Sequence, residues 1–247
     1  MKLKKFSNKI YCFSPTVMLL TFIFEVSAAA IALFRYKTSE IQRLIIYLLL
    51  ALAGFQAAEF MVCGGWGWSG VEWARVGYLS ITLLPPMGLQ LAHKIAGKKS
   101  GALVKIAYTT MFAFIAYYLF VTNGVSEKVC RANYSVFNVP EVASMLYGIY
   151  YYGWLLVALW FIYCQIKQLG GELSKKVFFK KSKSRQISAL KWLALGYLSF
   201  MLPTTFVNVV NPATIEGIPS IMCGFAVILA IILIGFVAPR TLEVKKK

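Results

Sequence analysis

Long apolar segments constrain this chain more than any other feature of its sequence. They are stretches of about twenty residues, and a helix of that length spans the roughly 30 Å hydrocarbon core of a bilayer. The chain has 247 residues, of which 59% are hydrophobic and only 14% are charged. A β-barrel needs alternating polar and apolar residues, which these stretches lack. The sequence therefore predicts an all-α integral membrane protein.

Hydrophobic runs, and the charged or glycine-containing segments between them, predict a bundle of seven transmembrane helices. The expected organisation is a short N-terminal segment at 1–14, a seven-helix domain at 15–238 and a basic tail at 239–247. The predicted helices cover residues 15–36, 41–63, 73–94, 102–122, 142–166, 187–209 and 217–238.

Basic residues mark one side of the predicted bundle. Segments 36–43, 95–101 and 167–191 are rich in Lys and Arg, and the segments between them are not. Because cytoplasmic loops carry the excess of Lys and Arg, we expect the N-terminus outside and the C-terminus in the cytoplasm. A cleaved signal peptide ending near 27–30 is an alternative that would leave six spans. The net charge of +17 is thus a topology signal, and no nucleic-acid partner is expected.

The densest positive charge lies in the 167–191 segment. Such a cluster attracts anionic lipid headgroups and fixes the orientation of the protein in the bilayer. The alternative interpretation is a contact surface for a cytoplasmic or membrane signalling partner. The basic residues concerned are Lys175, Lys176, Lys180, Lys181, Lys183 and Arg185.

Polar side chains within the predicted spans are the candidate site residues. Glu25 lies near the middle of the first span, and Gln56 and Glu59 lie toward the outer end of the second. An ionisable group at membrane depth is costly, so it should face the bundle interior or a cavity. Arg75 begins the third span on the same side, where it is a candidate partner for Glu59. A structural ion pair and a ligand or proton site are both open interpretations.

Adjacent prolines, Pro85 and Pro86, stand near the middle of the third predicted span. They remove backbone donors and leave carbonyl groups in the preceding turn without partners, so we expect the helix to kink or break there. A break in a membrane is tolerated only against protein or water. The prolines therefore indicate either the wall of an internal cavity or a packing kink.

Aromatic residues crowd the outer half of the predicted bundle. They are typical of an interfacial belt, and the alternative is an aromatic-lined pocket open to the outside. The residues are Trp66, Trp68, Trp73, Tyr117, Tyr118, Tyr147, Tyr150, Tyr151 and Tyr152.

Cys63 and Cys130 are expected on the same oxidising side, where they are a candidate disulfide pair. Cys12 and Cys223 are alternative partners. The single histidine, His93, lacks the neighbours that a zinc site needs, and the chain has no aspartate to hold magnesium. We therefore expect no metal, no cofactor and no enzymatic activity.

The third span carries a family resemblance. Trp73, Arg75, Gly77 and Tyr78, followed by the proline pair, resemble the seven-helix N-terminal region of certain bacterial membrane histidine kinases. Length and topology agree over residues 15–238, although the motif itself covers one span. The resemblance implies a bacterial inner membrane and a sensor module that passes a helix shift to a cytoplasmic output.

Only nine residues of this chain follow Ala238, so the resemblance implies a receptor-like or sensor-like module without its own output domain. Such a module would signal through a partner. A small secondary transporter or channel-like protein is the alternative function, because an ionisable group in a span also serves proton or ion transport. Water access to Glu25 from both faces in turn would distinguish transport from sensing.

Overall fold

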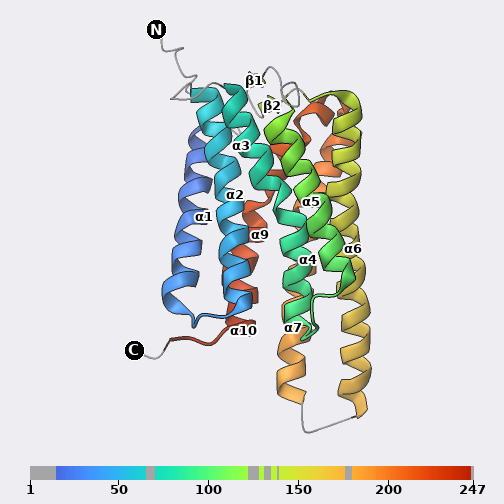
Figure 1. The fold of residues 1–247 in the computed structure, drawn as a ribbon. Coiled ribbons are helices and arrows are strands. Elements are labelled where there is room, and N and C mark those ends of the chain that lie inside the picture. Colours follow the sequence, from blue (N-terminus) through green and yellow to red (C-terminus); the bar gives the residue numbers. More distant parts are fainter. Residues whose placement is uncertain are drawn as a thin grey trace.

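The computed structural model describes residues 15–64, 70–121, 128–130, 135–137, 139–175 and 180–245. Its helices lie side by side along one direction, which confirms the predicted all-α architecture (Figure 1). The N-terminal end of α1 (Pro15–Arg35) marks what we name the upper end, and its last turn marks the lower end. A short antiparallel hairpin of β1 (Lys128–Cys130) and β2 (Ser135–Phe137), absent from the sequence-based prediction, lies at the upper end.

Six helices within the described residues are long and apolar enough to cross a membrane, and they coincide with six of the seven predicted spans. The first five are α1, α2 (Glu40–Gly64), α5 (Ala102–Phe120), α6 (Glu141–Lys175) and α7 (Lys180–Val210). After the short η2 (Pro212–Gly217) comes the sixth, which we name the last span. It consists of α8 (Ile218–Phe225), α9 (Val227–Ile232), a π-helical turn η3 (Leu233–Val237) and α10 (Ala238–Thr241).

The remaining predicted span, 73–94, is divided into two helices. They are α3 (Gly70–Thr82) and α4 (Leu84–Ile95), with 13 and 12 residues. At 1.5 Å per residue each helix is only about 20 Å long, shorter than the hydrocarbon core. Figure 1 shows them following one another from the upper end toward the lower end.

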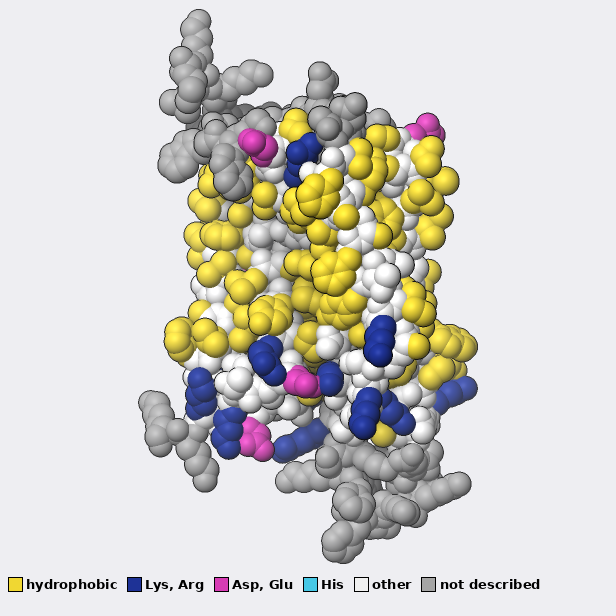
Figure 2. Space-filling model, viewed as in Figure 1, with side chains coloured by type: hydrophobic (Ala, Val, Ile, Leu, Met, Phe, Trp, Pro, Cys, Tyr) yellow, Lys and Arg dark blue, Asp and Glu magenta, His cyan; other side chains and the backbone are white. Residues whose placement is uncertain are grey.

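The surface of the bundle is apolar between two polar ends. In Figure 2 hydrophobic side chains form a broad band, and most of the basic side chains in view gather below it. Large side chains such as Phe34, Trp160 and Phe206 are well exposed within the long helices. Water disfavours such a surface, whereas lipid chains match it.

At the lower end the C-terminal segment meets the connection between α1 and α2. The Gln42 side-chain amide donates to the Ala32 carbonyl at 3.0 Å and the Tyr36 carbonyl at 3.3 Å, which provides partners for acceptors at the end of α1. The Lys37 amide donates to the Glu243 carbonyl at 2.8 Å, and the Lys245 amide donates to the Arg35 carbonyl at 2.9 Å. The C-terminal segment is therefore bound along the α1–α2 connection.

Candidate functional site

A cavity of about 530 Å³ lies in the upper half of the bundle, between α3, α6, η2 and α8. Its mouth is marked by the exposed side chains Glu141, Ser144 and Met145 on the first turns of α6. Its inner end is formed by Met222 and Cys223 of α8, both buried. A volume of this size accommodates a small organic molecule.

Tyrosine side chains from α3 and α6 form the aromatic part of the cavity wall: Tyr78, Tyr147, Tyr151 and Tyr152. The rings of Tyr78 and Tyr147 meet edge to face at 5.5 Å, and Tyr118 of α5 stacks behind Tyr78 at 4.6 Å. Such ring contacts stabilise the packing beyond the burial of area. The tyrosines are therefore held in place before any ligand binds.

The break between α3 and α4 lies directly beside this wall. Pro86 has no backbone N–H, so the Thr82 carbonyl lacks its helical donor. The Tyr150 hydroxyl donates to that carbonyl at 2.6 Å. The Thr82 hydroxyl donates to the Tyr78 carbonyl at 2.6 Å, which leaves it to accept from the Tyr147 hydroxyl at 3.1 Å. Two tyrosines of α6 thus stabilise the break.

Behind the inner end of the cavity lies a cluster of buried polar side chains from α1, α2 and α8. Glu25, Gln56, Glu59 and Ser220 are each at most 3% exposed. The Gln56 amide donates to the Cys223 carbonyl at 3.2 Å. Ser220 lies beside the Glu59 carboxyl group, and the Cys223 thiol is close enough to both carboxyl groups to interact with them electrostatically.

The cluster contains oxygen atoms that no described group satisfies. Both carboxyl oxygens of Glu25 and one of Glu59 are buried without a hydrogen-bond partner among the described residues. A buried carboxyl group without partners is costly, most of all when it is charged. These atoms are therefore available to a proton, a water molecule or a ligand group.

The candidate residues from the sequence fall into separate places. Glu25, Gln56 and Glu59 come together in the cluster described above. Arg75 is half-buried near the start of α3 and has interactions of its own; its pairing with Glu59 stays a prediction, and the side chain that the structure places beside Glu59 is Ser220. Pro85 and Pro86 lie in the first turn of α4.

Cys63 lies in the last turn of α2. Cys130 lies in β1, whose backbone contacts α2 and α3. Their side chains lie outside the described ones, so the disulfide stays a prediction. Of the two alternative partners, Cys223 is a free, buried thiol and Cys12 lies outside the described residues.

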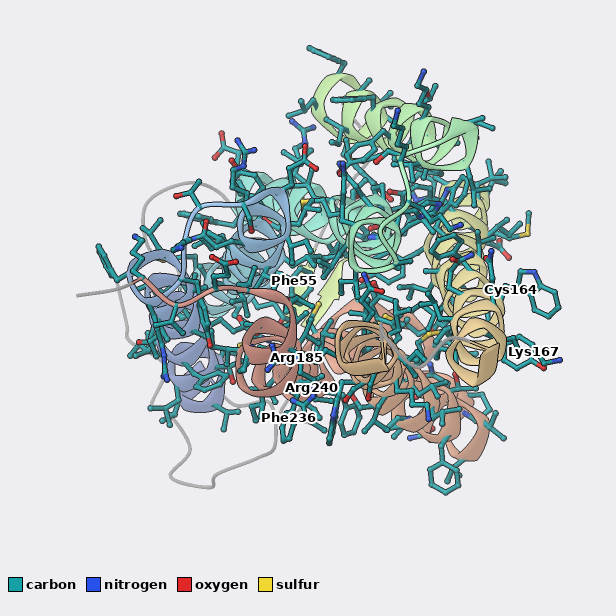
Figure 3. All side chains as sticks on the ribbon, turned by 90° about the horizontal axis from the view of Figure 1, so that it is seen from below. Phe55, Cys164, Lys167, Arg185, Phe236 and Arg240 are labelled. Atoms are coloured by element: carbon teal, nitrogen blue, oxygen red, sulfur yellow. The ribbon has the colours of Figure 1, made fainter. Side chains whose placement is uncertain are left out.

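Most of the basic 167–191 cluster also lies outside the described side chains: Lys175, Lys176, Lys180, Lys181 and Lys183. Arg185 is described and exposed. Viewed from below, Figure 3 shows Phe236 and Arg240 side by side on the last span and Lys167 at the outer edge of α6. The predicted lipid contact of this cluster therefore stays a prediction.

His93 has a structural environment. Its ring stacks on Phe161 at 3.7 Å, and its Nδ1 donates to the Leu89 carbonyl at 2.9 Å. Both contacts hold the ring inside the bundle, away from the cavity.

Sequence reasoning missed Thr82 and Ser220, which stand at the break and beside Glu59. Neither residue type is unusual inside a helix, so no local signal distinguishes them. The carboxyl groups give an indirect signal for Ser220, because a buried carboxyl favours a nearby hydroxyl.

Comparison with known proteins finds no match to this chain among family models, curated proteins or solved structures.

Proposed function

We propose that this chain is a receptor-like membrane protein of a bacterial inner membrane, which binds a small ligand in the cavity between α3, α6 and α8. The cavity faces the extracytoplasmic side. Binding changes the packing of the interrupted spans, and the change is read at the cytoplasmic end. A cytoplasmic or membrane signalling partner takes up the signal there, beside anionic lipid headgroups.

In this arrangement α3 and α4 together form a seventh crossing. Together with Leu83 they cover residues 70–95, which is long enough at 1.5 Å per residue. Seven crossings place the two ends of the domain on opposite sides of the bilayer. The gathering of basic side chains at the lower end supports a cytoplasmic location for that end (Figure 2).

One observation carries the proposal: a cavity of about 530 Å³ runs from exposed residues at the upper end to Cys223, which adjoins the buried carboxyl cluster. Pockets of this size with a few convergent polar groups are the usual form of a small-molecule site. Its wall includes Tyr147, one of the two tyrosines that contact Thr82 at the break between α3 and α4. A ligand in the cavity would therefore contact the part of the bundle best suited to shift.

Cysteine accessibility tests whether the cavity is open and from which side of the membrane it is reached. In a background without reactive native cysteines, Ser144→Cys reports on the mouth and Ile81→Cys, at a buried wall position, reports on the interior. We expect a membrane-impermeant maleimide added to intact cells to label both. Adding Gly148→Phe should protect Ile81→Cys at least several-fold and leave Ser144→Cys reactive, because Gly148 lines the cavity.

Gly153→Phe is the matched control. Gly148 and Gly153 are both on α6, and a Cβ added to either meets no described atom within 4 Å. Only Gly148 lines the cavity, so Gly153→Phe should leave the labelling of Ile81→Cys unchanged. Equal protection by both phenylalanines, or labelling of Ser144→Cys from the cytoplasmic side alone, would contradict the proposal.

A small secondary transporter is the second candidate function. The observation that favours it is the position of the carboxyl pair: Glu25 and Glu59 lie beside the last span, close to its interruption at Ala226. Transporters place coupling sites beside discontinuous helices near mid-membrane. Reconstituted protein should then take up protons along an imposed potential, and Glu25→Gln should abolish the uptake. A receptor leaves the proton flux at the level of protein-free liposomes.

A further inference from the structure

We infer that the cavity selects a hydrophobic organic cation, such as an aromatic or alkylated ammonium or phosphonium compound. This inference rests on the proposed function, because it names the chemical class of the ligand for the same cavity. It is carried by the charge, the aromatic faces and the oxygen atoms that surround the cavity.

The one charged side chain among the described lining residues is acidic. Glu141 is exposed at the mouth, and the described lining residues include no Lys, Arg or His. The basic side chains of the described chain lie mostly at the other end of the bundle (Figure 2). An anionic ligand would therefore enter a cavity of low polarity without a counter-charge, which is costly. A cation meets a carboxylate on entry.

The wall offers aromatic rings to a cation. Tyr78, Tyr147, Tyr151 and Tyr152 line the cavity, and the face of an aromatic ring carries partial negative charge. The attraction is stronger where less water competes, and three of these tyrosines are buried. The intervening surface is apolar, with Ile81, Ile218 and Met222. Such a lining suits a cation whose charged atom is surrounded by hydrocarbon groups.

The inner end adds acceptors. Cys223 separates the cavity from the Glu25 and Glu59 carboxyl groups, and it interacts electrostatically with both. Three of their four oxygen atoms are buried without hydrogen-bond partners in the described part of the chain. An ionised carboxyl group offers only acceptors, and a protonated one keeps a carbonyl oxygen that accepts. The inner end therefore has acceptor oxygens behind Cys223 and no described basic side chain in its lining.

A pair of probe ions with nearly the same size and shape tests the inference. Tetraphenylphosphonium is the cation and tetraphenylborate is the anion. Binding of each is measured by equilibrium dialysis to the full chain in nanodiscs, and the amount bound by the Gly148→Phe protein is subtracted from that bound by the Gly153→Phe protein. The subtraction removes partition into lipid, which both proteins share.

We expect the cation to bind at least ten times more tightly than the anion. Glu141→Gln keeps the size of the side chain and should reduce this ratio several-fold. Tyr152→Leu should weaken cation binding roughly two- to thirty-fold, the range of a single cation–π contact. Tyr152→Phe keeps the ring and loses only the hydroxyl contact with Thr205, so it should bind the cation nearly as well as the parent.

Three other outcomes overturn the inference. Equal binding of the two ions, or tighter binding of the anion, excludes the charge preference but keeps the cavity as a ligand site. An unchanged ratio in Glu141→Gln together with equal effects of Tyr152→Leu and Tyr152→Phe excludes the named residues. If neither ion distinguishes Gly148→Phe from Gly153→Phe, the cavity binds neither probe and the inference fails; the proposed function then depends on the labelling of Ile81→Cys, which tests the cavity independently. The thermal unfolding of each variant, measured beforehand, shows that it is folded.

Discussion

Two segments of the bundle are interrupted, and they are interrupted in different ways. Between α3 and α4 the cause is covalent, because Pro86 cannot donate to the Thr82 carbonyl, and Tyr150 from another helix supplies the donor. In the last span the interruption at Ala226 has no adjacent proline. There the Cys223 carbonyl accepts from the Ala226 amide at 3.1 Å and from Gln56 at 3.2 Å. A missing donor makes the first break, and the second depends on tertiary contacts.

Both interrupted spans pack closely against α7, where they contact two neighbouring residues, Gly196 and Tyr197. Gly88 of α4 lies against the Tyr197 hydroxyl, and a Cβ at Gly88 would also come within 3.1 Å of the Tyr197 Cζ. At Gly196 of α7, a Cβ would come within 2.7 Å of the Leu229 side chain on α9. The comparison between the two spans can therefore be tested by matched changes on either side of α7.

The largest effect is expected at the α4–α7 contact. Gly88→Ala places a methyl group against the rigid, buried ring of Tyr197, and overpacking of this kind costs about 2–3 kcal/mol. Thermal unfolding of the detergent-solubilised protein measures the loss. Adding Tyr197→Phe removes the hydroxyl that clashes and should restore part of the stability. Gly153→Ala, which meets no described atom within 4 Å, is the control. If Gly88→Ala and Gly153→Ala unfold at the same temperature, α4 and α7 are not in close contact.

The next largest loss of stability is expected for Tyr150→Phe, which removes the donor to the Thr82 carbonyl at the proline break. The carbonyl is then buried without a partner, at a cost of about 1–2 kcal/mol. The same unfolding measurement applies. Tyr47→Phe, on an exposed tyrosine of α2, is the matched control and should leave the unfolding temperature unchanged. Equal stability of the two variants would mean that the break does not need this hydrogen bond.

Gly196→Ala tests the other side of α7 and should cost about 1 kcal/mol. The effect is smaller than at Gly88 because the atom in the way is Leu229 Cδ1, the end of a flexible side chain that can turn aside. Leu229→Ala in the same chain should remove the clash, so the double variant should lose less than the two single losses added together. Strict additivity would show that the two residues do not touch.

Gln56→Leu should have a smaller effect than Tyr150→Phe. It removes one of two donors to the Cys223 carbonyl, and the bond from the Ala226 amide remains. We expect a loss of about 0.5 kcal/mol, which is near the average for hydrogen bonds between membrane helices. Gln56→Glu, which keeps the shape and adds a third carboxyl to the cluster, should be worse than Gln56→Leu. A loss from Gln56→Leu as large as that from Tyr150→Phe would show that both breaks depend equally on a side-chain donor.

The smallest effect is expected in the C-terminal segment that follows the last span. Lys37 lies 2.8 Å from the exposed Glu243 carboxylate and holds the pKa of that carboxyl below its usual range. A lowered pKa in the folded state adds stability above the ordinary pKa near 4.5, and the contribution disappears as the pH falls through the lowered pKa. Below that value the exchange protection of the Lys245 amide should decrease, after correction for the intrinsic rate. Glu243→Gln should show the lower protection at every pH, and a pH-dependent change that persists in it would assign the effect to another group.

The same contrast explains what the sequence can and cannot predict. Six spans follow from the length of the apolar runs, and the proline pair marks the break that precedes α4. At the second break Gly224 is a weaker signal than a proline pair, and the side-chain donor that contacts this break comes from α2. Likewise Glu25 and Glu59 are recognisable as unusual intramembrane carboxyls, but their meeting with Cys223 depends on how α1, α2 and α8 pack.

The hydrogen bonds between the C-terminal segment and the α1–α2 connection link the first and last spans at the lower end. The last span carries both the inner end of the cavity and, through α10, this link. A small tilt of α8 would thus be felt at the lower end, where Lys37 and Glu243 form an ion pair. A partner that touches both residues would detect the tilt as a change in one surface, formed by the α1–α2 connection and the C-terminal segment.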